Sequence, residues 1–418
     1  MTIPLSIAVY SHYFSPEIGA PSARIYDLSC QWLKTNNTVR VVTCVPNHPT
    51  GKVADGYRRG WYQQETLSGV DVHRNWSYIT PNSGFFKKTL GHLSLLPSSL
   101  VNLRRLGKVD VIIGTSPTPF AALAGLLAAK QRKVPFVLEI RDLWPAIFAE
   151  MGIIKNKHII RLLEWGELWL YRQSTQIVTV TEAFRQDLIR RNIPAQKITT
   201  IRNSADTEFW QPQPKPLALE KELNLEEKFV VLYIGAHGSS HALESILDAA
   251  QKVADNKTIR FLFVGEGSRK TALQSYAKEK QLTNVTFLDA TDKQGVKAYY
   301  SLADVCLVPL RDIPLFNGFI PSKMFEIMAM EKPIVASLNG EAAEILKEAQ
   351  SAEIVAPEDS TAIAKAILAI QADPVHAKKL GKRGREFVES NCSRKHSADR
   401  YLNVLRDAIE IYNGDGSL

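Results

Sequence analysis

The alternation of short apolar runs with helical stretches constrains this 418-residue chain more than any other feature. The apolar runs are rich in β-branched residues, as strands are, and short loops separate them from the helical patterns. Such alternation is typical of an α/β fold with doubly wound parallel sheets covered by helices. The strand candidates are Ser6–Tyr10, Val39–Cys44, Val109–Gly114, Phe136–Glu139, Ile177–Val180, Val230–Ile234, Ile259–Val264, Val285–Leu288, Val305–Val308 and Ile334–Ala336.

The alternation occurs twice, with a proline-rich break at Gln211–Pro216. Because the chain is too long for one typical core, two Rossmann-like domains facing a cleft are expected. We place the first domain over residues 1–205 and the second over residues 206–392. A helix with one apolar stripe should follow over residues 393–418 and cover a core face. Ligands of such sheets bind at the carboxyl ends of the strands, so the loops after the strands are the informative ones.

Net charge and cysteine usage limit the function classes. The charge of +8 favours an anionic partner, which is nucleic acid, a phosphate ligand or an acidic membrane. No basic repeat with interleaved aromatics points to nucleic acid, so no nucleic-acid partner is expected. Four scattered cysteines without a C-x-x-C pair fit a reducing cytoplasm and predict no zinc site. The apolar run Pro117–Ala129 is too short to span a bilayer and is expected to form a buried helix.

Two loops of the first half carry candidate site residues. Gly19 follows the first strand and precedes a helix, so backbone N–H groups there can approach a ligand. An ordinary strand-to-helix turn is the alternative. Arg141 and Asp142 follow the strand Phe136–Glu139. The arginine suits a diphosphate or an acceptor phosphate, and the aspartate suits a sugar hydroxyl or the role of a base. A structural ion pair is the alternative reading.

Glycine-containing loops follow two strands of the second half. Gly235, His237 and Gly238 follow the strand Val230–Ile234, where glycine and serine can cradle a phosphate through backbone amides. Gly265 and Gly267 follow Ile259–Val264 as a bare G-x-G, without the third glycine of a dinucleotide fingerprint.

The most informative segment is Gly318–Ala336. Ser322 and Lys323 open a helix, where amides and an ammonium group can meet a diphosphate. Glu326 lies one turn further on, and its carboxylate can accept hydrogen bonds from both hydroxyls of a ribose.

Taken together, these segments resemble retaining family 4 glycosyltransferases of the GT-B fold, over nearly the whole chain. Within that family the chain looks most similar to bacterial O-antigen and capsule N-acetyl-fucosamine transferases. The segments that carry the resemblance are Y-F-S-P-E-I-G-A-P-S-A-R from Tyr13, P-N-H-P-T-G-K-V from Pro46, E-I-R-D-L-W-P from Glu139, I-R-N-S-A-D-T-E-F-W from Ile201 and P-S-K-M-F-E-I-M-A from Pro321.

The resemblance implies a role for each candidate residue. Glu326 would hold the nucleotide ribose, Ser322 and Lys323 the diphosphate, and Phe287 and Leu288 would present backbone to the base. Further donor-side residues would be Gly19, Gly235, His237, Gly238, Gly265 and Gly267. Arg141, Asp142 and Lys323 would be catalytic, and Glu17, Ser116 and Asn203 would lie on the acceptor side. Asn203 and Asp206 would mark the domain junction, and the terminal helix would return to the first domain.

Three positions depart from the family pattern. The first glutamate of the family's E-x7-E motif is replaced by Gly318. Arg141 stands where the family usually has a histidine. The basic pair of the phosphate loop is absent, with His237 and His241 nearby instead.

The resulting expectation is a metal-independent retaining glycosyltransferase without a cofactor. It would move a sugar, such as an N-acetylated hexose or deoxyhexose, from a UDP-sugar to a polyprenyl-diphosphate-linked or saccharide acceptor in surface polysaccharide biosynthesis. A non-catalytic partner subunit of the same fold and a sugar-nucleotide epimerase are the alternatives.

The stretch from Phe85 to Lys108 mixes leucines, phenylalanines and basic residues without an acidic one. Such a stretch can lie in the headgroup region of an anionic membrane. A core-packing helix pair with a solvated basic edge is the alternative. The protein is therefore expected in the cytoplasm, peripheral on the inner face of the cytoplasmic membrane.

Overall fold

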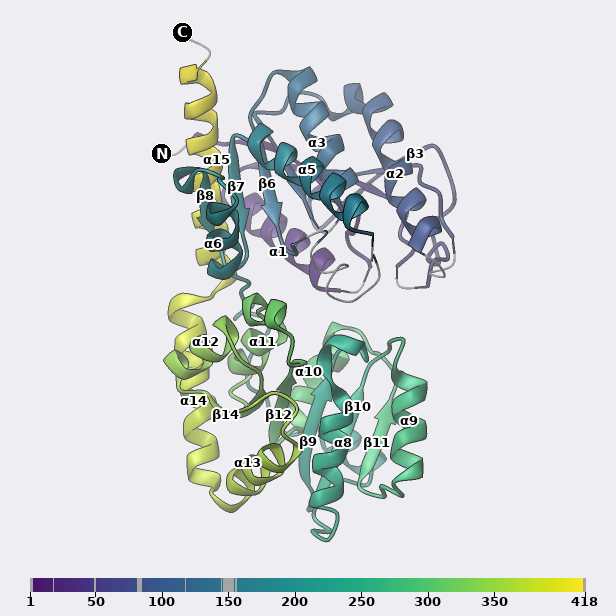
Figure 1. Cartoon of the computed structure of the whole chain (residues 1–418), viewed down its shortest axis with the longest axis vertical. Coiled ribbons are helices and arrows are strands. Elements are labelled where there is room, and N and C mark those ends of the chain that lie inside the picture. The colour runs from purple at the N-terminus through teal and green to yellow at the C-terminus, as the bar shows by residue number, and fades with distance from the viewer. Residues whose placement is uncertain are drawn as a thin grey trace. The chain divides into compact units, whose positions relative to one another are not determined.

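The chain forms two compact units in a computed structural model that describes residues 3–17, 19–48, 50–80, 85–116, 118–143, 145, 154 and 156–415 (Figure 1). The first unit comprises Met1–Arg202 and Arg394–Leu418, and the second Asn203–Ser393. These divisions lie a few residues from the predicted limits. Ala205 N donates to Cys392 O at 3.0 Å, which ties the residues around both divisions to the second unit.

The first unit is built on a sheet of eight strands in the order β3-β4-β2-β1-β5-β6-β7-β8, parallel except for the β3–β4 pair. Its strands are β1 Ser6–Tyr10, β2 Thr38–Cys44, β3 Tyr62–Leu67, β4 Val70–Asn75, β5 Val111–Thr115, β6 Phe136–Ile140, β7 Gln176–Thr179 and β8 Ile198–Thr200. Its helices are α1 Ala20–Lys34, α2 Phe85–Val101, the 3-10 turn η1 Leu103–Leu106, α3 Pro119–Arg132, α5 Lys157–Gln173, α6 Glu182–Arg190, η2 Ala195–Lys197 and α15 Arg394–Asp415.

Alternating residues of the first sheet face different helices, as the two-residue period of a strand requires. Ile7 and Val9 of β1 share a core cluster with α1 and with Tyr401 of α15. The terminal helix, yellow in Figure 1, therefore packs within the first unit although nearly two hundred residues of the second unit precede it. The opposite face of the sheet packs against α3, where Gly114 and Gly125 lie against Phe136.

The second unit is built on a six-stranded parallel sheet in the order β11-β10-β9-β12-β13-β14. Its strands are β9 Phe229–Ile234, β10 Ile259–Val264, β11 Val285–Leu288, β12 Val305–Pro309, β13 Ile334–Ser337 and β14 Ala352–Val355. Its helices are α7 Leu217–Glu222, η3 Ser239–His241, α8 Leu243–Lys252, α9 Lys270–Glu279, α10 Lys293–Leu302, η4 Pro314–Gly318, α11 Lys323–Ala329, α12 Glu341–Ala349, α13 Ser360–Ala372 and α14 Pro374–Asn391. Helices on both faces bury the sheet, with α11 and α14 on one side and α8 and α13 on the other.

Each sheet has a point at which the winding direction reverses. In the first unit the chain moves outward from β1 to β2, and later returns to place β5 on the other side of β1. In the second unit β9 has β10 on one side and β12 on the other. Ligands of doubly wound sheets bind outside the carboxyl ends of the strands at such reversals. Ligands are therefore expected at the loops after β1, β5, β9 and β12.

The predicted α/β fold with parallel sheets is confirmed, but the edge strands β8 and β14 and the edge hairpin β3–β4 were not predicted. Its strands carry many polar residues, and only the Ser68-Gly69 turn, with φ of 50° and 87°, gives a sequence signal. The helix predicted over Pro117–Ala129 is α3. Ile18, Pro49, Pro117 and Trp144 lie outside the described residues. No helix among the described residues is long and apolar enough to cross a membrane.

Candidate functional site

Two glycine-containing loops of the second unit touch each other through their backbones. Gly235 and Gly265 follow β9 and β10 with φ of 139° and 143°, a region that side chains disfavour. A Cβ atom on Gly265 would collide with the carbonyl oxygen of Gly235, and one on Gly267 would collide with that of His237. His237 N also donates to Glu266 O at 2.8 Å. The two loops therefore hold a bare backbone surface at the carboxyl end of the sheet.

Lys323 lies directly beside this surface, at the first residue of α11. Its ammonium nitrogen is buried, has no hydrogen-bond partner among the described residues, and lies 4.1 Å from the centroid of the Tyr233 ring. Burial lowers the pKa of Lys323 to about 7, although the nearby Glu326 carboxylate acts in the opposite direction. Burying a cation without a hydrogen-bond partner costs free energy, so the position of this ammonium group is suited to binding an anion.

Glu326 lies one turn further along α11 and is half-buried. The hydroxyl of Tyr300 donates to its Oε2 atom at 3.3 Å. This contact orients the carboxylate beside Lys323, on the same helix face, because residues three apart are neighbours on a helix. Ser322 precedes Lys323 as the N-cap residue of α11.

The ring of His237 is buried completely, among the aromatic rings of Tyr233, Phe263 and Phe287. Burial, followed by the charge of Lys270, lowers the pKa of His237 to about 4, so the ring is neutral at physiological pH. The His237 ring thus packs into the core beneath the loop after β9. The backbone of His237 and Gly238, and not the ring, is part of the backbone surface described above.

Phe287 and Leu288 lie at the end of β11, the edge strand. The Phe287 ring stacks on Phe263 with centroids 5.1 Å apart. Leu288 O accepts from Gly265 N at 3.2 Å and from Lys270 Nζ at 3.1 Å. These bonds fix the loop after β10 against β11, next to the position where a base is expected.

Arg141 and Asp142 follow β6 at the carboxyl edge of the first sheet. Arg141 is 9% exposed, and burial lowers its pKa to about 10 while Glu139 opposes the shift. Burial also raises the pKa of the Asp142 carboxyl, and Arg141 opposes that shift. Glu139 itself pairs with Arg24 at 3.1 Å. The buried Arg24–Glu139 ion pair thus joins α1 to β6 next to the loop that carries Arg141 and Asp142.

Two of the predicted acceptor-side residues hold loops together. The hydroxyl of Ser116, after β5, accepts from Arg141 N at 2.8 Å and so joins two loops. The Glu17 carboxylate accepts from the backbone N–H groups of Asn47, His48 and Phe14 at 2.8, 2.9 and 3.2 Å. Burial raises the pKa of Glu17, while these three hydrogen bonds act to lower it.

Gly19, Asn203 and Gly318 complete the predicted positions. Gly19 is exposed, has φ of 150° and precedes α1. Asn203 is the first residue of the second unit. Gly318 is buried and ends η4.

An aromatic and imidazole cluster beside β1 and β2 was not predicted from the sequence. The hydroxyl of Tyr13 lies 3.2 Å from His92 Nε2, and the Tyr13 ring is 5.1 Å from that of His48. His12 lies beside the same ring of His92, with centroids 4.4 Å apart. These residues line a small polar pocket with Ser77. The quoted motif from Pro46 contains His48, but the contact of Tyr13 with His92 of α2 depends on tertiary packing.

No three His, Cys, Asp or Glu side chains gather as a set of metal ligands in the part of the chain that the structure describes.

Two family models match the two units. The glycosyl transferase 4-like domain matches residues 19–204, and the group 1 glycosyl transferase domain matches residues 228–373. The group 1 model thus spans all strands of the second sheet, and the 4-like model spans those of the first sheet except β1.

Similar proteins of known sequence carry glycosyltransferase names. The chain is 24% identical over 414 residues to the putative colanic acid biosynthesis glycosyl transferase WcaI of Escherichia coli K12, covering 96% of this chain and all of the relative. It is 26% identical over 325 residues to the probable glycosyltransferase WbjE of Pseudomonas aeruginosa, covering 75% and 78% of the two chains.

The solved structures share the fold at low sequence identity. Sucrose-phosphate synthase from Thermosynechococcus elongatus superposes with a TM-score of 0.74 at 18% identity, covering 96% of this chain and 98% of that one. HepE of Anabaena, solved with UDP and glucose, gives 0.70 at 16% identity, covering 96% and 99%. The two-unit architecture is therefore that of the GT-B glycosyltransferases.

Proposed function

Because this chain is a glycosyltransferase, with a glycosyl transferase 4-like domain followed by a group 1 domain, we propose that it transfers a sugar from a UDP-sugar to a lipid-linked or saccharide acceptor. We place this reaction in surface polysaccharide biosynthesis. WcaI, named for colanic acid biosynthesis, supports the pathway class, and HepE, solved with UDP and glucose, supports the donor class. An N-acetylated hexose or deoxyhexose is the proposed sugar.

One observation supports the proposed binding of a UDP-sugar donor. It is the buried ammonium group of Lys323 beside Gly235, which has no hydrogen-bond partner among the described residues. A diphosphate bound there would accept hydrogen bonds from Lys323 and from the loop backbone. Glu326, one turn away, is placed to accept hydrogen bonds from ribose hydroxyls. The same cation would stabilise the negative charge that develops on the diphosphate as it leaves.

The transfer step that we propose retains the anomeric configuration. The bond between the anomeric carbon and the diphosphate oxygen breaks, and the acceptor oxygen bonds to the same carbon on the same face. The acceptor proton passes to the leaving diphosphate, so UDP is released. No metal is proposed for this step, because Lys323 and the backbone amides supply the positive potential.

Arg141 and Asp142 are the proposed acceptor-side groups. The raised pKa of Asp142 makes it a stronger hydrogen-bond acceptor for a sugar hydroxyl, while Arg141 suits an acceptor phosphate. Asp142→Asn should lower turnover and leave UDP affinity unchanged. Asp255→Asn, an exposed position in the second unit, is the matched control. Lost UDP binding with normal turnover at saturation would assign Asp142 to the donor instead.

A donor panel tests the function directly. Purified protein is incubated with UDP-glucose, UDP-N-acetylglucosamine, UDP-galactose and UDP-N-acetyl-fucosamine, and released UDP is measured with and without an undecaprenyl-diphosphate-linked sugar. Acceptor-dependent UDP release supports transfer. UDP binding without any release would favour the non-catalytic subunit, an alternative suggested by Gly318 in place of the first motif glutamate. Acceptor-independent isomerisation of the donor would favour an epimerase.

A chelator should leave the rate of transfer unchanged. A steep loss of rate would overturn the metal-free step.

We further propose a peripheral position on the inner face of the cytoplasmic membrane. Lys87, Arg104 and Lys108 are exposed on α2, η1 and the loop after it, together with Leu90 and Leu93 at 52% and 41% exposure. The buried Leu95, Leu103 and Leu106 on the same elements pack into the unit, so only one face is available to lipid. Phe85, Phe86 and Lys88 have side chains outside the described part.

Sedimentation with anionic vesicles tests the membrane position. Replacing Lys87, Arg104 and Lys108 by serine should reduce binding at low salt, because each basic side chain contributes about 1 kcal/mol at an anionic surface. The matched control replaces three lysines of α14, Lys378, Lys379 and Lys382, which are exposed on the second unit. Equal sedimentation of wild type and both variants would argue against this surface.

A further inference from the structure

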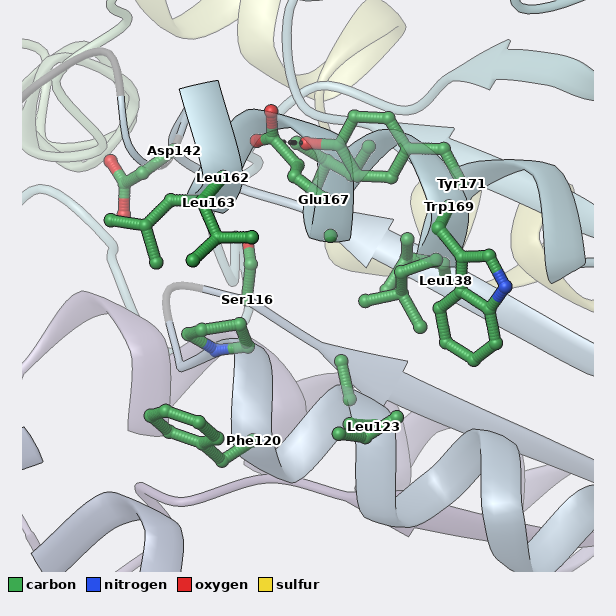
Figure 2. Close-up of a pocket in the computed structure, with 15 residues that line it drawn as sticks. Ser116, Phe120, Leu123, Leu138, Asp142, Leu162, Leu163, Glu167, Trp169 and Tyr171 are labelled. Atoms are coloured by element: carbon green, nitrogen blue, oxygen red, sulfur yellow. Dashed lines mark hydrogen bonds between the residues drawn. The ribbon is translucent and has the colours of Figure 1, made fainter. Parts of the chain in front are cut away.

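The first unit contains an apolar cavity of about 240 Å³ between α3, α5 and β6 (Figure 2). Leucine and aromatic side chains line most of its wall. Figure 2 shows Phe120 and Leu123 of α3 on one side and Leu162 and Leu163 of α5 on the other. Leu138 of β6 forms part of the floor. The space is therefore suited to a hydrocarbon and not to a sugar or a nucleotide.

Two polar residues of the wall, Glu167 and Tyr171, already have hydrogen-bond partners within the protein. Glu167 Oε1 accepts from the hydroxyl of Tyr171 at 2.5 Å, and Glu167 Oε2 accepts from Arg191 at 2.6 Å. Both carboxylate oxygens of Glu167 are thus satisfied within the protein. The carboxylate of Glu167 therefore does not require a polar ligand in the cavity.

One end of the cavity lies at the proposed acceptor site. Figure 2 shows Ser116 and Asp142 at that end, and Trp169 and Tyr171 at the other. Ser116 and Asp142 follow β5 and β6, so this end meets the carboxyl edge of the sheet. A chain that occupies the cavity would therefore have its head group beside Asp142.

The outer surface of α5 continues the apolar lining. Leu162 lines the cavity and is 66% exposed, and Ile159 and Trp165 on the same helix are 48% and 65% exposed. Lys157 and Arg161 are exposed among them. An apolar surface with basic residues at its margin complements a lipid whose head group carries phosphate.

We propose that this cavity binds the hydrocarbon chain of the lipid-linked acceptor, at the part of the chain that adjoins its phosphate. The proposal rests on the proposed transfer function and narrows the acceptor to an isoprenoid or similar lipid. An apolar cavity of about 150 Å³ is known to hold a benzene molecule, so this one accommodates a short length of chain. The rest of the chain would follow the exposed face of α5.

Gly166 provides the variant that tests the cavity. It lines the cavity from α5, and a Cβ atom added to it would meet nothing within 4 Å. Gly166→Phe therefore adds its Cβ atom without a clash, and we expect the ring to occupy the cavity. It also replaces a glycine inside a helix, which favours folding. Gly414→Phe on α15 is the matched control, because Gly414 is also a helical glycine with open space at its Cβ position.

The probe is farnesyl phosphate, added to the full-length protein and followed by calorimetry, with UDP titrated separately. We expect wild type and Gly414→Phe to bind farnesyl phosphate, and Gly166→Phe to bind it about tenfold or more weakly. Each methylene excluded from an apolar site costs roughly fourfold in affinity. UDP affinity should be the same in all three proteins.

Several outcomes would overturn the proposal. Equal farnesyl phosphate binding by wild type and Gly166→Phe would place the chain elsewhere, and no binding by wild type would remove the lipid site. In both cases intact UDP binding and acceptor-dependent transfer would leave the proposed function standing. Farnesyl phosphate binding without any UDP binding would instead remove the transfer function. Loss of vesicle sedimentation in Gly166→Phe, without loss of farnesyl phosphate binding, would assign the region to bulk membrane lipid.

Discussion

Lys323 carries its charge only part of the time at neutral pH, because burial lowers its pKa to about 7. A bound diphosphate would favour the charged form and raise this pKa again. UDP binding should therefore take up a proton and weaken as the pH rises from about 7 to about 9, by up to about tenfold per pH unit. Over this range the terminal phosphate of UDP is already ionised.

Calorimetry across this pH range checks the prediction. Lys323→Met should bind UDP about 10- to 150-fold more weakly near pH 7 and should lose the pH dependence. Lys347→Met, at an exposed lysine of α12, is the control. A pH dependence that persists in Lys323→Met would assign it to another group.

Glu326→Ala should weaken UDP binding about 10- to 150-fold, because a charge-assisted hydrogen bond to the ribose is lost. The substitution also removes the acceptor of the Tyr300 hydroxyl, so thermal unfolding must be measured beside affinity. Glu344→Ala, with a side chain 71% exposed on α12, should change neither quantity. Unchanged UDP affinity in a folded Glu326→Ala protein would exclude Glu326 from the site.

At the scale of elements, the loops after β9 and β10 pack directly on each other, because the backbone after β9 leaves no room for a Cβ atom at Gly265 or Gly267. Gly265→Ala should destabilise the second unit by more than the about 1–2 kcal/mol that a left-handed backbone costs an alanine. The excess comes from the collision with the carbonyl oxygen of Gly235. Chemical denaturation and UDP titration measure both effects.

Gly56→Ala separates the cost of a positive φ from the cost of a Cβ collision. Gly56 also has a positive φ, of 82°, but a Cβ atom there would meet nothing within 4 Å. Gly56→Ala should therefore lose only the stability that a positive φ costs an alanine. If the two variants lose equal stability, the contact between the two loops is not the reason that glycine is needed.

At the scale of the whole molecule, α15 completes the first unit from the far end of the sequence. Tyr401 is fully buried against Trp32, with ring centroids 5.3 Å apart, and Trp32 Nε1 donates to Ala398 O at 3.2 Å. Tyr401→Ala should cost about 3–5 kcal/mol, as other buried aromatic truncations do. For a unit of this size that corresponds to a fall of about 6–20 °C in its melting temperature.

Scanning calorimetry with two resolved transitions would test this. The transition of the first unit should move, and that of the second should stay. Tyr412→Ala is the control on the same helix, because Tyr412 is 37% exposed. A shift confined to the second unit would contradict the assignment of α15 to the first.

The sequence by itself determined the central strands, the parallel sheets and the helix that begins at Lys323, because apolar periodicity and turn chemistry are local. It also placed Arg141 and Asp142 at a strand end. The short edge strands β8 and β14 were not predicted. The polar hairpin β3–β4 was missed, since its pairing is set by neighbours that are not local in sequence.

Only the tertiary structure decided what surrounds each side chain. Three contacts join segments far apart in the chain: Lys323 with Tyr233, Glu17 with the amides of Asn47 and His48, and Tyr13 with His92. The cavity beside Asp142 depends in the same way on how α3 and α5 pack on β6. Periodicity reports which face of an element is apolar, but the space left between two apolar faces depends on the shapes that meet there.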